Sequence, residues 1–274
     1  MREMLACAAD ARAMAEVLSR HKDGTKNFDC LVWEDSTADG SPITRPRLRA
    51  ALGELFEFDG EVLFYFSGHG FLSATGGLLC TSDATTDDWG IHMQEVVDLA
   101  VQSAARHILL ILDCCHGGAI ANLPTMNKDS GKNPLSVLRE NMTVIAASRP
   151  NEGAIEAGGH GLFTGALLDA LEGGAADHMG FVSAPAVYEY ASRRFTAWEQ
   201  RPVYKTNATE VLSVRECEPL ISRLQLQQLS TLFPSADHKY RLGPEYEPED
   251  ERGNVKEPVN KEKVAIAQLF KNYR

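Results

Sequence analysis

Residues Ile108 to Gly118, which read ILLILDCCHGG, give the strongest indication of how this chain folds. Five aliphatic residues lead directly into an acid, two thiols, a histidine and two glycines. The aliphatic run has the length and the branched side chains of a strand that is buried on both faces of a sheet. The glycines end such a strand, and they allow another backbone to approach closely. Because open α/β sheets place their sites at the carboxyl ends of strands, we expect reactive side chains at this edge.

Helical and strand patterns alternate along the rest of the chain. Apolar residues at helical spacing predict helices over Leu5–Leu18, Thr44–Leu55, Met93–Ala105, Phe163–Leu171 and Ala184–Trp198. Apolar and β-branched runs predict strands over Phe28–Trp33, Glu61–Phe66, Leu78–Cys80, Thr143–Ser148 and Val211–Val214. Strands that alternate with helices form crossover units, so the predicted fold class is α/β, with a mostly parallel sheet and helices on both of its faces.

Length, charge and cysteine content exclude several classes of protein. The 274 residues suffice for one large domain with an appendage, and the net charge of −11 disfavours a general nucleic-acid binder. No apolar run approaches the roughly 20 residues of a membrane span, and Met1–Asp10 lacks the pattern of a signal peptide. The six cysteines are scattered, which indicates free thiols in a reducing cytoplasm. We therefore expect a cytoplasmic monomer that contacts neither nucleic acid nor a membrane.

Two segments depart from the regular pattern. Residues 121–141 are rich in asparagine, lysine, glycine and proline and have few apolar anchors, so we expect an exposed loop whose length is typical of function or disorder. The composition changes again near Glu216, where a tail with an acidic, proline-containing stretch begins. We therefore divide the chain into a domain with a larger half over about 1–120, a linker over 121–141 and a smaller half over 142–215, followed by an accessory region over 216–274.

Two predicted strands end in complementary chemical groups. His69 follows the strand that begins at Glu61, and Cys115 follows the strand that begins at Ile108. One crossover with a helix separates these strands, so they can lie side by side with His69 and Cys115 facing one groove. A thiol needs a base to supply thiolate at neutral pH, and a histidine can take that proton and give it to a leaving amine. The backbone N–H groups of Gly70 and Cys115 could then form an oxyanion hole.

Other roles for the same residues stay open at this point. A histidine at a strand end is often a hydrogen-bonded structural group, and a cysteine is often a small core residue. Cys114 and Cys115 could form a thiol redox sensor. Zinc binding by this pair with His69 and His116 is disfavoured, because adjacent cysteines seldom ligate one tetrahedral ion, so we expect no metal site.

Two segments, 64–70 (FYFSGHG) and 112–118 (LDCCHGG), closely resemble the histidine and cysteine motifs of the caspase-like cysteine peptidases. The resemblance covers about residues 5–215 and is to the metacaspase and bacterial caspase-like branch. The cysteine motif of that branch runs Asp-x-Cys-His-Ser-Gly, and Gly117 stands here in place of the serine. The resemblance implies a three-layer sandwich fold.

The resemblance also assigns roles to individual residues. It implies that His69 is the general base and acid of a cysteine endopeptidase with a Cys-His dyad, that Cys115 is the nucleophile, and that Cys114 is a packed neighbour. The residues themselves favour the same roles for His69 and Cys115, because the two predicted strand ends carry the base and the thiol that this chemistry needs.

In metacaspases two carboxylates line the pocket for the residue before the scissile bond, and they select arginine or lysine. By the resemblance Asp113 is one of these acids, and Asp10, within the loosely matching segment 6–11 (ACAADA), is the other. Ser148 is expected to border the cleft. The chemistry agrees, because a buried guanidinium needs bidentate carboxylate partners. The alternatives are a turn acid at a strand end for Asp113 and a charge on the helix surface for Asp10.

The resemblance further predicts substrates and control. We expect protein substrates with Arg or Lys before the scissile bond, in a bacterial stress, cell-death or phage-defence pathway. The linker looks like a cleavable activation segment, cut by the protein itself or by an activating protease after Lys128, Lys132 or Arg139. The alternative is a pseudo-peptidase scaffold that binds a partner through the accessory region 216–274.

The chain departs from the family pattern in two places. Segment 90–95 (GIHMQE) lacks the paired aspartates with which many metacaspases bind calcium, so we expect no calcium activation and no cofactor. Family members normally begin with an apolar strand, whereas only Met1–Met4 precede the segment that holds Asp10. Because the loss of a central strand exposes its neighbours' edges, we expect either an upstream translation start or another segment or chain in this position.

Overall fold

The computed structural model describes most of the chain between residues 5 and 235. The described residues are 5–35, 41–114, 117–122, 138–147, 156–157, 160–195, 202–233 and 235. The chain divides into two compact units, of which the first is Met1–Ala176 with Gly180–Glu218 and the second is Asp177–Met179 with Pro219–Arg274. Within the described ranges, every helix is too short or too polar to span a bilayer.

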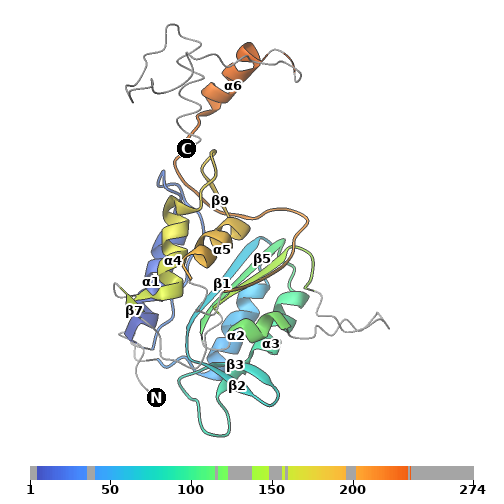
Figure 1. The fold of residues 1–274 in the computed structure, drawn as a ribbon. Coiled ribbons are helices and arrows are strands. Elements are labelled where there is room, and N and C mark those ends of the chain that lie inside the picture. The colour runs from blue at the N-terminus through green and yellow to red at the C-terminus, as the bar shows by residue number, and fades with distance from the viewer. Residues whose placement is uncertain are drawn as a thin grey trace. The chain divides into compact units, whose positions relative to one another are not determined.

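A four-stranded sheet forms the centre of the first unit (Figure 1). Its strand order is β1 (Glu61–Gly68), β5 (His107–Cys114), β6 (Met142–Ala146) and β10 (Val203–Asn207). The first three strands are parallel to one another, and β10 is antiparallel to β6. All eight residues of β5 are buried, which confirms the buried strand that the aliphatic run predicts.

Helices cover both faces of this sheet. One face carries α2 (Arg45–Phe56) and α3 (Met93–Gln102), and the other carries α1 (Leu5–Ser19), α4 (Leu162–Asp169) and α5 (Ala184–Arg193) (Figure 1). Alternate residues of β5 enter the two core clusters, so that Leu110 packs on the first side and Leu109 on the second. Burial of each such side chain contributes about 1.5–3 kcal/mol. The predicted α/β sandwich with a mainly parallel sheet is confirmed.

Local sequence signals set several helix ends. Thr44 is the N-cap of α2, and Pro46 lies in its first turn, where the missing proline N–H leaves no helical hydrogen bond unmade. After α4 the chain forms a single π-helical turn, η2 (Ala170–Gly174). Gly173 in this turn has a φ of +125°, a conformation that side-chain-bearing residues rarely adopt.

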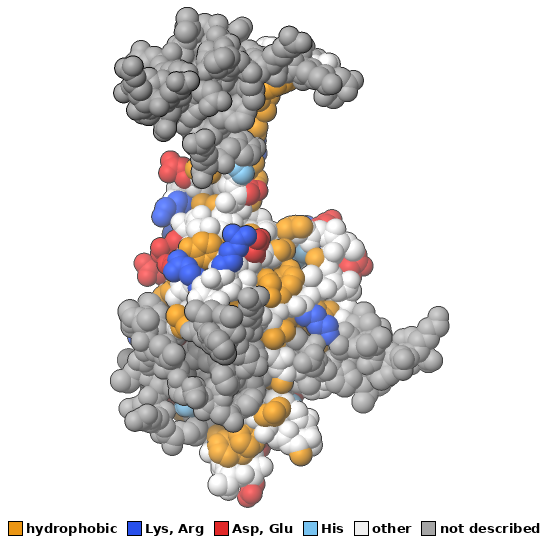
Figure 2. Space-filling model, in the orientation of Figure 1, with side chains coloured by type: hydrophobic (Ala, Val, Ile, Leu, Met, Phe, Trp, Pro, Cys, Tyr) orange, Lys and Arg blue, Asp and Glu red, His pale blue; other side chains and the backbone are white. Residues whose placement is uncertain are grey.

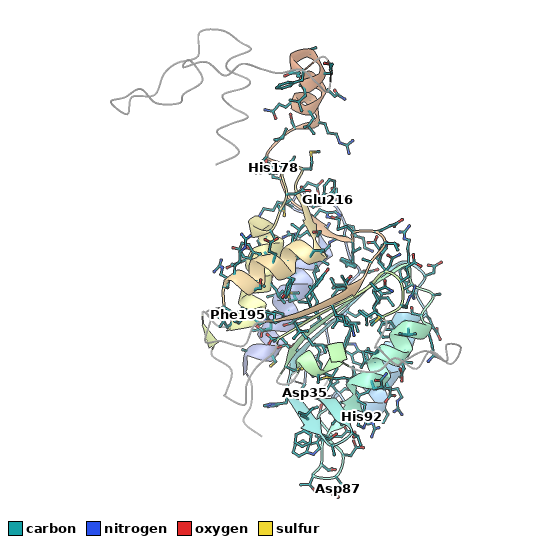
Figure 3. All side chains as sticks on the ribbon, turned by 45° about the vertical axis from the view of Figure 1, so that its right-hand side comes forward. Asp35, Asp87, His92, His178, Phe195 and Glu216 are labelled. Atoms are coloured by element: carbon teal, nitrogen blue, oxygen red, sulfur yellow. The ribbon has the colours of Figure 1, made fainter. Side chains whose placement is uncertain are left out.

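A small antiparallel sheet follows β1 directly. It consists of β2 (Gly70–Ser73), β3 (Gly76–Cys80) and β4 (Gly90–His92), and the strand predicted at Leu78–Cys80 is part of β3. Asp87 lies at the outer tip of the loop between β3 and β4 (Figure 3). Gly90 closes this loop with a φ of +143°, and a Cβ there would lie 2.1 Å from the carbonyl oxygen of Leu79. The position therefore requires glycine.

The remaining elements of the first unit are short. They are η1 (Gly117–Asn122), the strand pair β7 (Glu156–Ala157) and β8 (His160–Gly161), and the pair β9 (Phe181–Ser183) and β11 (Ser213–Glu216). The last strand predicted at Val211–Val214 is shifted to β11, and it pairs with β9 in a separate sheet. Val211 itself is 71% exposed.

The prediction of a strand at Phe28–Trp33 is wrong. The segment is irregular, and none of its residues belongs to a strand. Its residues alternate as a strand would, because Phe28 and Cys30 pack on the core whereas Leu31 is 91% exposed. The segment pairs with no strand among the described residues, however, so it forms no ladder of hydrogen bonds.

Charged side chains of both signs lie together over α4 and α5 (Figure 2). Arg194 pairs with Asp169 at 2.8 Å and lies over the ring of Tyr190, and Arg193 pairs with Glu189. These side chains are about half exposed or more, so solvent screens each pair and its contribution to stability is small.

The second unit contains one described helix, α6 (Arg223–Leu232). Ser222 and Gln225 form a capping box at its start, in which each side chain bonds to the backbone of the other residue. The apolar spacing within Leu220–Leu229 of the tail predicts a helix there, and the structure has it displaced by three residues. Of the predicted accessory region, residues 234 and 236–274 lie outside the described residues.

Candidate active site

His69 and Gly70 follow the carboxyl end of β1. In the parallel pair of β1 and β5, Ser67 lies opposite Asp113 and Gly68 lies opposite Cys114. His69 therefore comes directly after the last paired residues, and it is half-buried. The predicted nucleophile, Cys115, lies outside the described residues.

The backbone around Gly70 has a defined orientation. The N–H of Cys80 donates to the carbonyl oxygen of His69 over 3.0 Å, and Gly70 is the register partner of Leu79. This bond pattern makes Gly70 and Leu79 a non-hydrogen-bonded pair of the antiparallel ladder. The N–H of Gly70 consequently points away from β3, and it is available to a group on the other side of β2.

Asp113 lies at the end of β5 and is only 2% exposed. The hydroxyl of Thr164, on α4, donates to Oδ2 of Asp113 over 2.6 Å. The hydroxyl of Tyr65, on β1, lies 2.6 Å from Oγ1 of Thr164. A strand, a neighbouring strand and a helix on one face of the sheet thus meet at this carboxylate.

Asp10 lies on α1 and is 1% exposed, so the alternative of a charge on the helix surface is wrong. Its Oδ2 accepts a hydrogen bond from the hydroxyl of Ser67 over 3.3 Å and another from the N–H of Gly161 over 3.4 Å. Asp10 is therefore held at the same edge of the sheet as His69, because Ser67 lies two residues before that histidine.

The carboxylates of Asp10 and Asp113 both influence the pKa of the Tyr65 hydroxyl. Burial raises the pKa of the Tyr65 hydroxyl well above its usual value of 10.0. The negative charge of Asp113 raises this pKa further, and that of Asp10 does so to a smaller extent, whereas hydrogen bonds with Thr164 and Ser67 oppose the shift. The structure therefore brings Asp10 and Asp113 into one buried, electronegative neighbourhood.

Sequence reasoning missed the hydroxyl groups that hold these acids. Ser67 and Tyr65 lie inside the histidine motif, and Thr164 lies inside an apolar helix, LFTGALLD. The single polar residue on the buried side of that helix is the signal that could have identified Thr164, because a buried hydroxyl needs a partner.

Of four other predicted site residues, the structure describes only one. Ser148, Lys128 and Lys132 lie outside the described residues. Arg139 is described and half-buried, and its guanidinium donates to the carbonyl oxygens of Ser103 and Ala105, both over 2.6 Å.

The acids beyond the histidine are engaged with protein groups. Asp83 accepts hydrogen bonds from the hydroxyl of Thr81 over 2.6 Å and from the N–H of Arg45 over 3.0 Å. These bonds, with that of Thr81 first, lower the pKa of Asp83. The guanidinium of Arg45 also pairs with Asp88. Across the described ranges, no three histidine, cysteine, aspartate or glutamate side chains converge as metal ligands would.

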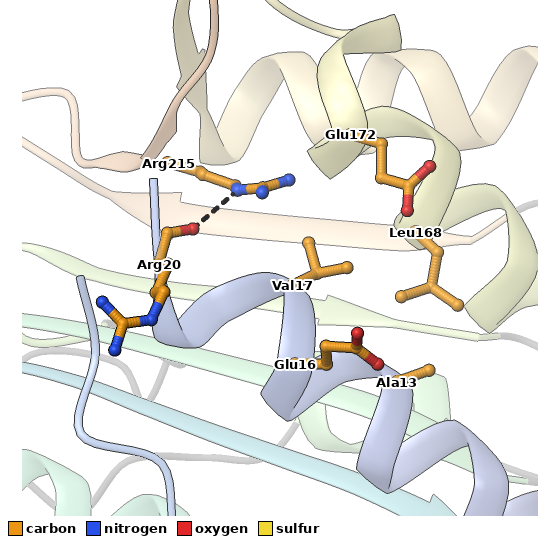
Figure 4. A pocket seen from close by; sticks show the side chains of 7 residues that line it. All are labelled: Ala13, Glu16, Val17, Arg20, Leu168, Glu172 and Arg215. Carbon is orange, nitrogen blue, oxygen red and sulfur yellow. Dashed lines mark hydrogen bonds between the residues drawn. The ribbon is translucent and has the colours of Figure 1, made fainter. Parts of the chain in front are cut away.

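A cavity of about 440 Å³ lies away from these residues, between α1, the α4–η2 segment and β11 (Figure 4). Arg215 projects into it, and Nε of this arginine donates to the carbonyl oxygen of Arg20 over 2.9 Å. The other lining residues are Ala13, Glu16, Val17, Leu168 and Glu172. Of the predicted catalytic and specificity residues that the structure describes, none lines the cavity, so we do not assign it to the active site.

The α/β sandwich with a mainly parallel sheet is consistent with the fold of a caspase-like cysteine peptidase. The family model of the caspase domain matches residues 1–213, and the chain therefore belongs to the caspase domain family. Members of this family are cysteine peptidases, which hydrolyse peptide bonds in protein substrates. No curated protein matches the chain.

Proposed function

We propose that this protein is an endopeptidase with a Cys-His dyad that cleaves its substrates after arginine or lysine. The observation that carries the specificity is the pair of buried acids, Asp10 and Asp113, which come from separate elements and share the neighbourhood of Tyr65 and Ser67.

In the proposed mechanism, His69 takes the proton of the Cys115 thiol, and the thiolate sulfur bonds to the scissile carbonyl carbon. The oxyanion that forms accepts hydrogen bonds from the N–H groups of Gly70 and Cys115. His69 then gives the proton to the leaving amine as the peptide bond breaks, and water releases the acyl group from sulfur. The register supports this pairing, because His69 directly follows Gly68, and Gly68 lies opposite Cys114, the residue before Cys115 in the sequence.

The proposed specificity follows from the cost of burying negative charge. A carboxylate loses hydration when it is buried, and neutral hydroxyl donors recover only part of that loss. A guanidinium or ammonium group brought by the substrate attracts both carboxylates and offsets one of the two negative charges, whereas an aspartate side chain would add a third negative charge. We therefore expect discrimination in favour of Arg and Lys and against Asp.

A peptidase assay tests both parts of the proposal. Fluorogenic peptides with Arg, Lys, citrulline or Asp before the scissile bond are compared in the wild type, Cys115→Ala, Asp113→Asn and the matched control Asp98→Asn, an acid on α3. We expect cleavage after Arg and Lys only, its loss in Cys115→Ala, and a decrease of about 100-fold in kcat/KM for Asp113→Asn. Preference for citrulline or Asp would contradict the specificity.

We propose further that cleavage of the linker controls the enzyme, with Lys128 and Lys132 as the cleavage positions. Arg139 is less suited to this role, because a protease would have to withdraw its guanidinium from two backbone carbonyl groups. The neighbouring Leu138 is also buried, at 4% exposure. Mass spectrometry of active enzyme that shows only an intact linker would reject control by cleavage, and a new terminus after Arg139 would reject the choice of positions.

The wider context is also part of the proposal. We infer a cytoplasmic enzyme of a bacterial stress, cell-death or phage-defence pathway that works as a monomer and without calcium. Activity that disappears on addition of a calcium chelator, and returns with calcium, would contradict the last point.

A further inference from the structure

Two hydroxyl groups form a chain that ends on Asp113. Thr164 Oγ1 lies 2.6 Å from Oδ2 of Asp113 and 2.6 Å from the hydroxyl of Tyr65. Thr164 has no solvent exposure, and its neighbours on α4, Phe163 and Leu167, are core residues. A hydroxyl in such surroundings is costly unless it is hydrogen-bonded, so this side chain is fixed by its two partners.

The direction of the two hydrogen bonds follows from the number of protons. A threonine hydroxyl has one hydrogen, and the carboxylate of Asp113 can only accept, so Thr164 donates to Asp113. Thr164 must then accept from Tyr65, whose hydroxyl keeps its proton because burial and the two acids raise its pKa. Both hydroxyl groups therefore donate toward the carboxylate.

We propose that Thr164, supported by Tyr65, is a positioning residue that fixes the plane of the Asp113 carboxylate for two-point contact with a substrate arginine, and thereby sets a preference for arginine over lysine. The inference rests on the proposed function, in which Asp113 binds the basic side chain. A guanidinium is a planar fork that needs an aligned carboxylate, whereas an ammonium is a compact charge that tolerates rotation of the carboxylate. The loss of alignment therefore weakens arginine binding more than lysine binding.

The test compares kcat and KM for matched Arg and Lys peptides in the full chain. Thr164→Val keeps the shape of the side chain and removes the hydroxyl. We expect the Arg-to-Lys ratio of kcat/KM to fall about tenfold, mainly through a higher KM for Arg, as for the loss of one charge-assisted hydrogen bond. Thr164→Ser keeps the hydroxyl and should restore the ratio. Tyr65→Phe should lower it about two- to threefold, because Thr164 loses only its donor.

Thr143→Val is the matched control. Thr143 lies on β6, is 7% exposed, and its Oγ1 lies 2.8 Å from Oγ1 of Thr206. Its loss should cost stability and leave the Arg-to-Lys ratio unchanged. An equal loss of Arg and Lys cleavage in Thr164→Val, or an unchanged ratio, overturns the inference. Should Thr164→Val not fold, an unchanged ratio in Tyr65→Phe has the same meaning.

Asp113→Asn separates this inference from the proposed function. If Asp113→Asn cleaves Arg and Lys peptides as well as the wild type does, the proposed function fails and the inference fails with it. If Asp113→Asn loses both activities while Thr164→Val keeps the wild-type ratio, only the positioning role of Thr164 is rejected.

Discussion

Ser67 donates its hydroxyl hydrogen to Oδ2 of Asp10 over 3.3 Å, and this bond joins the end of β1 to α1. Ser67 is also the register partner of Asp113. One serine, two residues before His69, therefore connects the two acids of the proposed specificity site with the strand that carries the proposed base.

Replacement of Asp10 tests whether the second acid binds substrate. Asp10→Asn keeps the size of the side chain and an oxygen acceptor for Ser67, but it removes the charge. We expect kcat/KM for Arg and Lys peptides to fall about tenfold or more, through KM, because a buried cation loses one of its two counter-charges. Glu16→Gln, an exposed position on the same helix, is the control. Unchanged KM values in Asp10→Asn would leave Asp10 without a role in binding.

The pKa of Tyr65 predicts how stability changes in alkali. Burial and the charge of Asp113 raise the pKa of Tyr65 in the folded state, so from about pH 10 upward the unfolded chain binds fewer protons than the folded one. The free energy of unfolding should therefore fall as pH rises above 10. Urea unfolding between pH 8 and pH 11 should show a smaller fall for Tyr65→Phe than for the wild type, and parallel curves would contradict this.

Acid should act on Asp83 in the opposite sense. The hydroxyl of Thr81 and the N–H of Arg45 lower the pKa of Asp83 in the folded state, so its contribution to stability is present above the unfolded value near 3.8. That contribution is lost as pH falls through the lower pKa of the folded state. Unfolding midpoints at decreasing pH should thus fall more steeply for the wild type than for Asp83→Asn, whereas Asp87→Asn at the loop tip should follow the wild type.

Arg139 should stabilise the protein through its two carbonyl partners. Arg139→Met keeps the aliphatic part of the side chain but leaves the oxygens of Ser103 and Ala105 without this charged donor. We expect the free energy of unfolding to fall by about 1–3 kcal/mol in denaturant titrations. Arg106→Met removes an exposed arginine whose ion pair with Glu61 is 3.9 Å long, and it should change stability by less than about 0.5 kcal/mol. Equal effects of the two changes would show that the contacts of Arg139 add nothing.

The fold could be predicted from sequence where side chains alone determine burial. The aliphatic run of β5 fits only a buried strand, and the apolar spacing of α1 fits only a helix packed on the core. The structure contains both elements. Pairing depends on the rest of the chain, and there the prediction fails. Phe28–Trp33 has the alternation of a strand but pairs with no described strand. The strand β10 (VYKTN) is too short and too polar to be recognised before its pairing with β6 is known.

In the candidate site, too, residues within a local motif could be predicted, whereas contacts between distant parts of the chain could not. His69, Asp10 and Asp113 lie in motifs with recognisable spacing, and the structure brings the two acids together. Thr164 could not be found in this way, because it follows Asp113 by 51 residues and its role appears only when α4 packs on the sheet. A single polar residue in an apolar helix indicates that its side chain has a hydrogen-bond partner, but it does not identify that partner.

The proposed peptidase activity is tested by the hydrolysis of an Arg-containing fluorogenic peptide by the full chain and by its Cys115→Ala variant, with thermal unfolding as a check that both proteins are folded. We predict that the wild type cleaves after arginine and that Cys115→Ala loses at least about 1,000-fold in kcat/KM. Equal rates in the two folded proteins would contradict the role of Cys115 as nucleophile, and cleavage after Asp in place of Arg would contradict the proposed specificity.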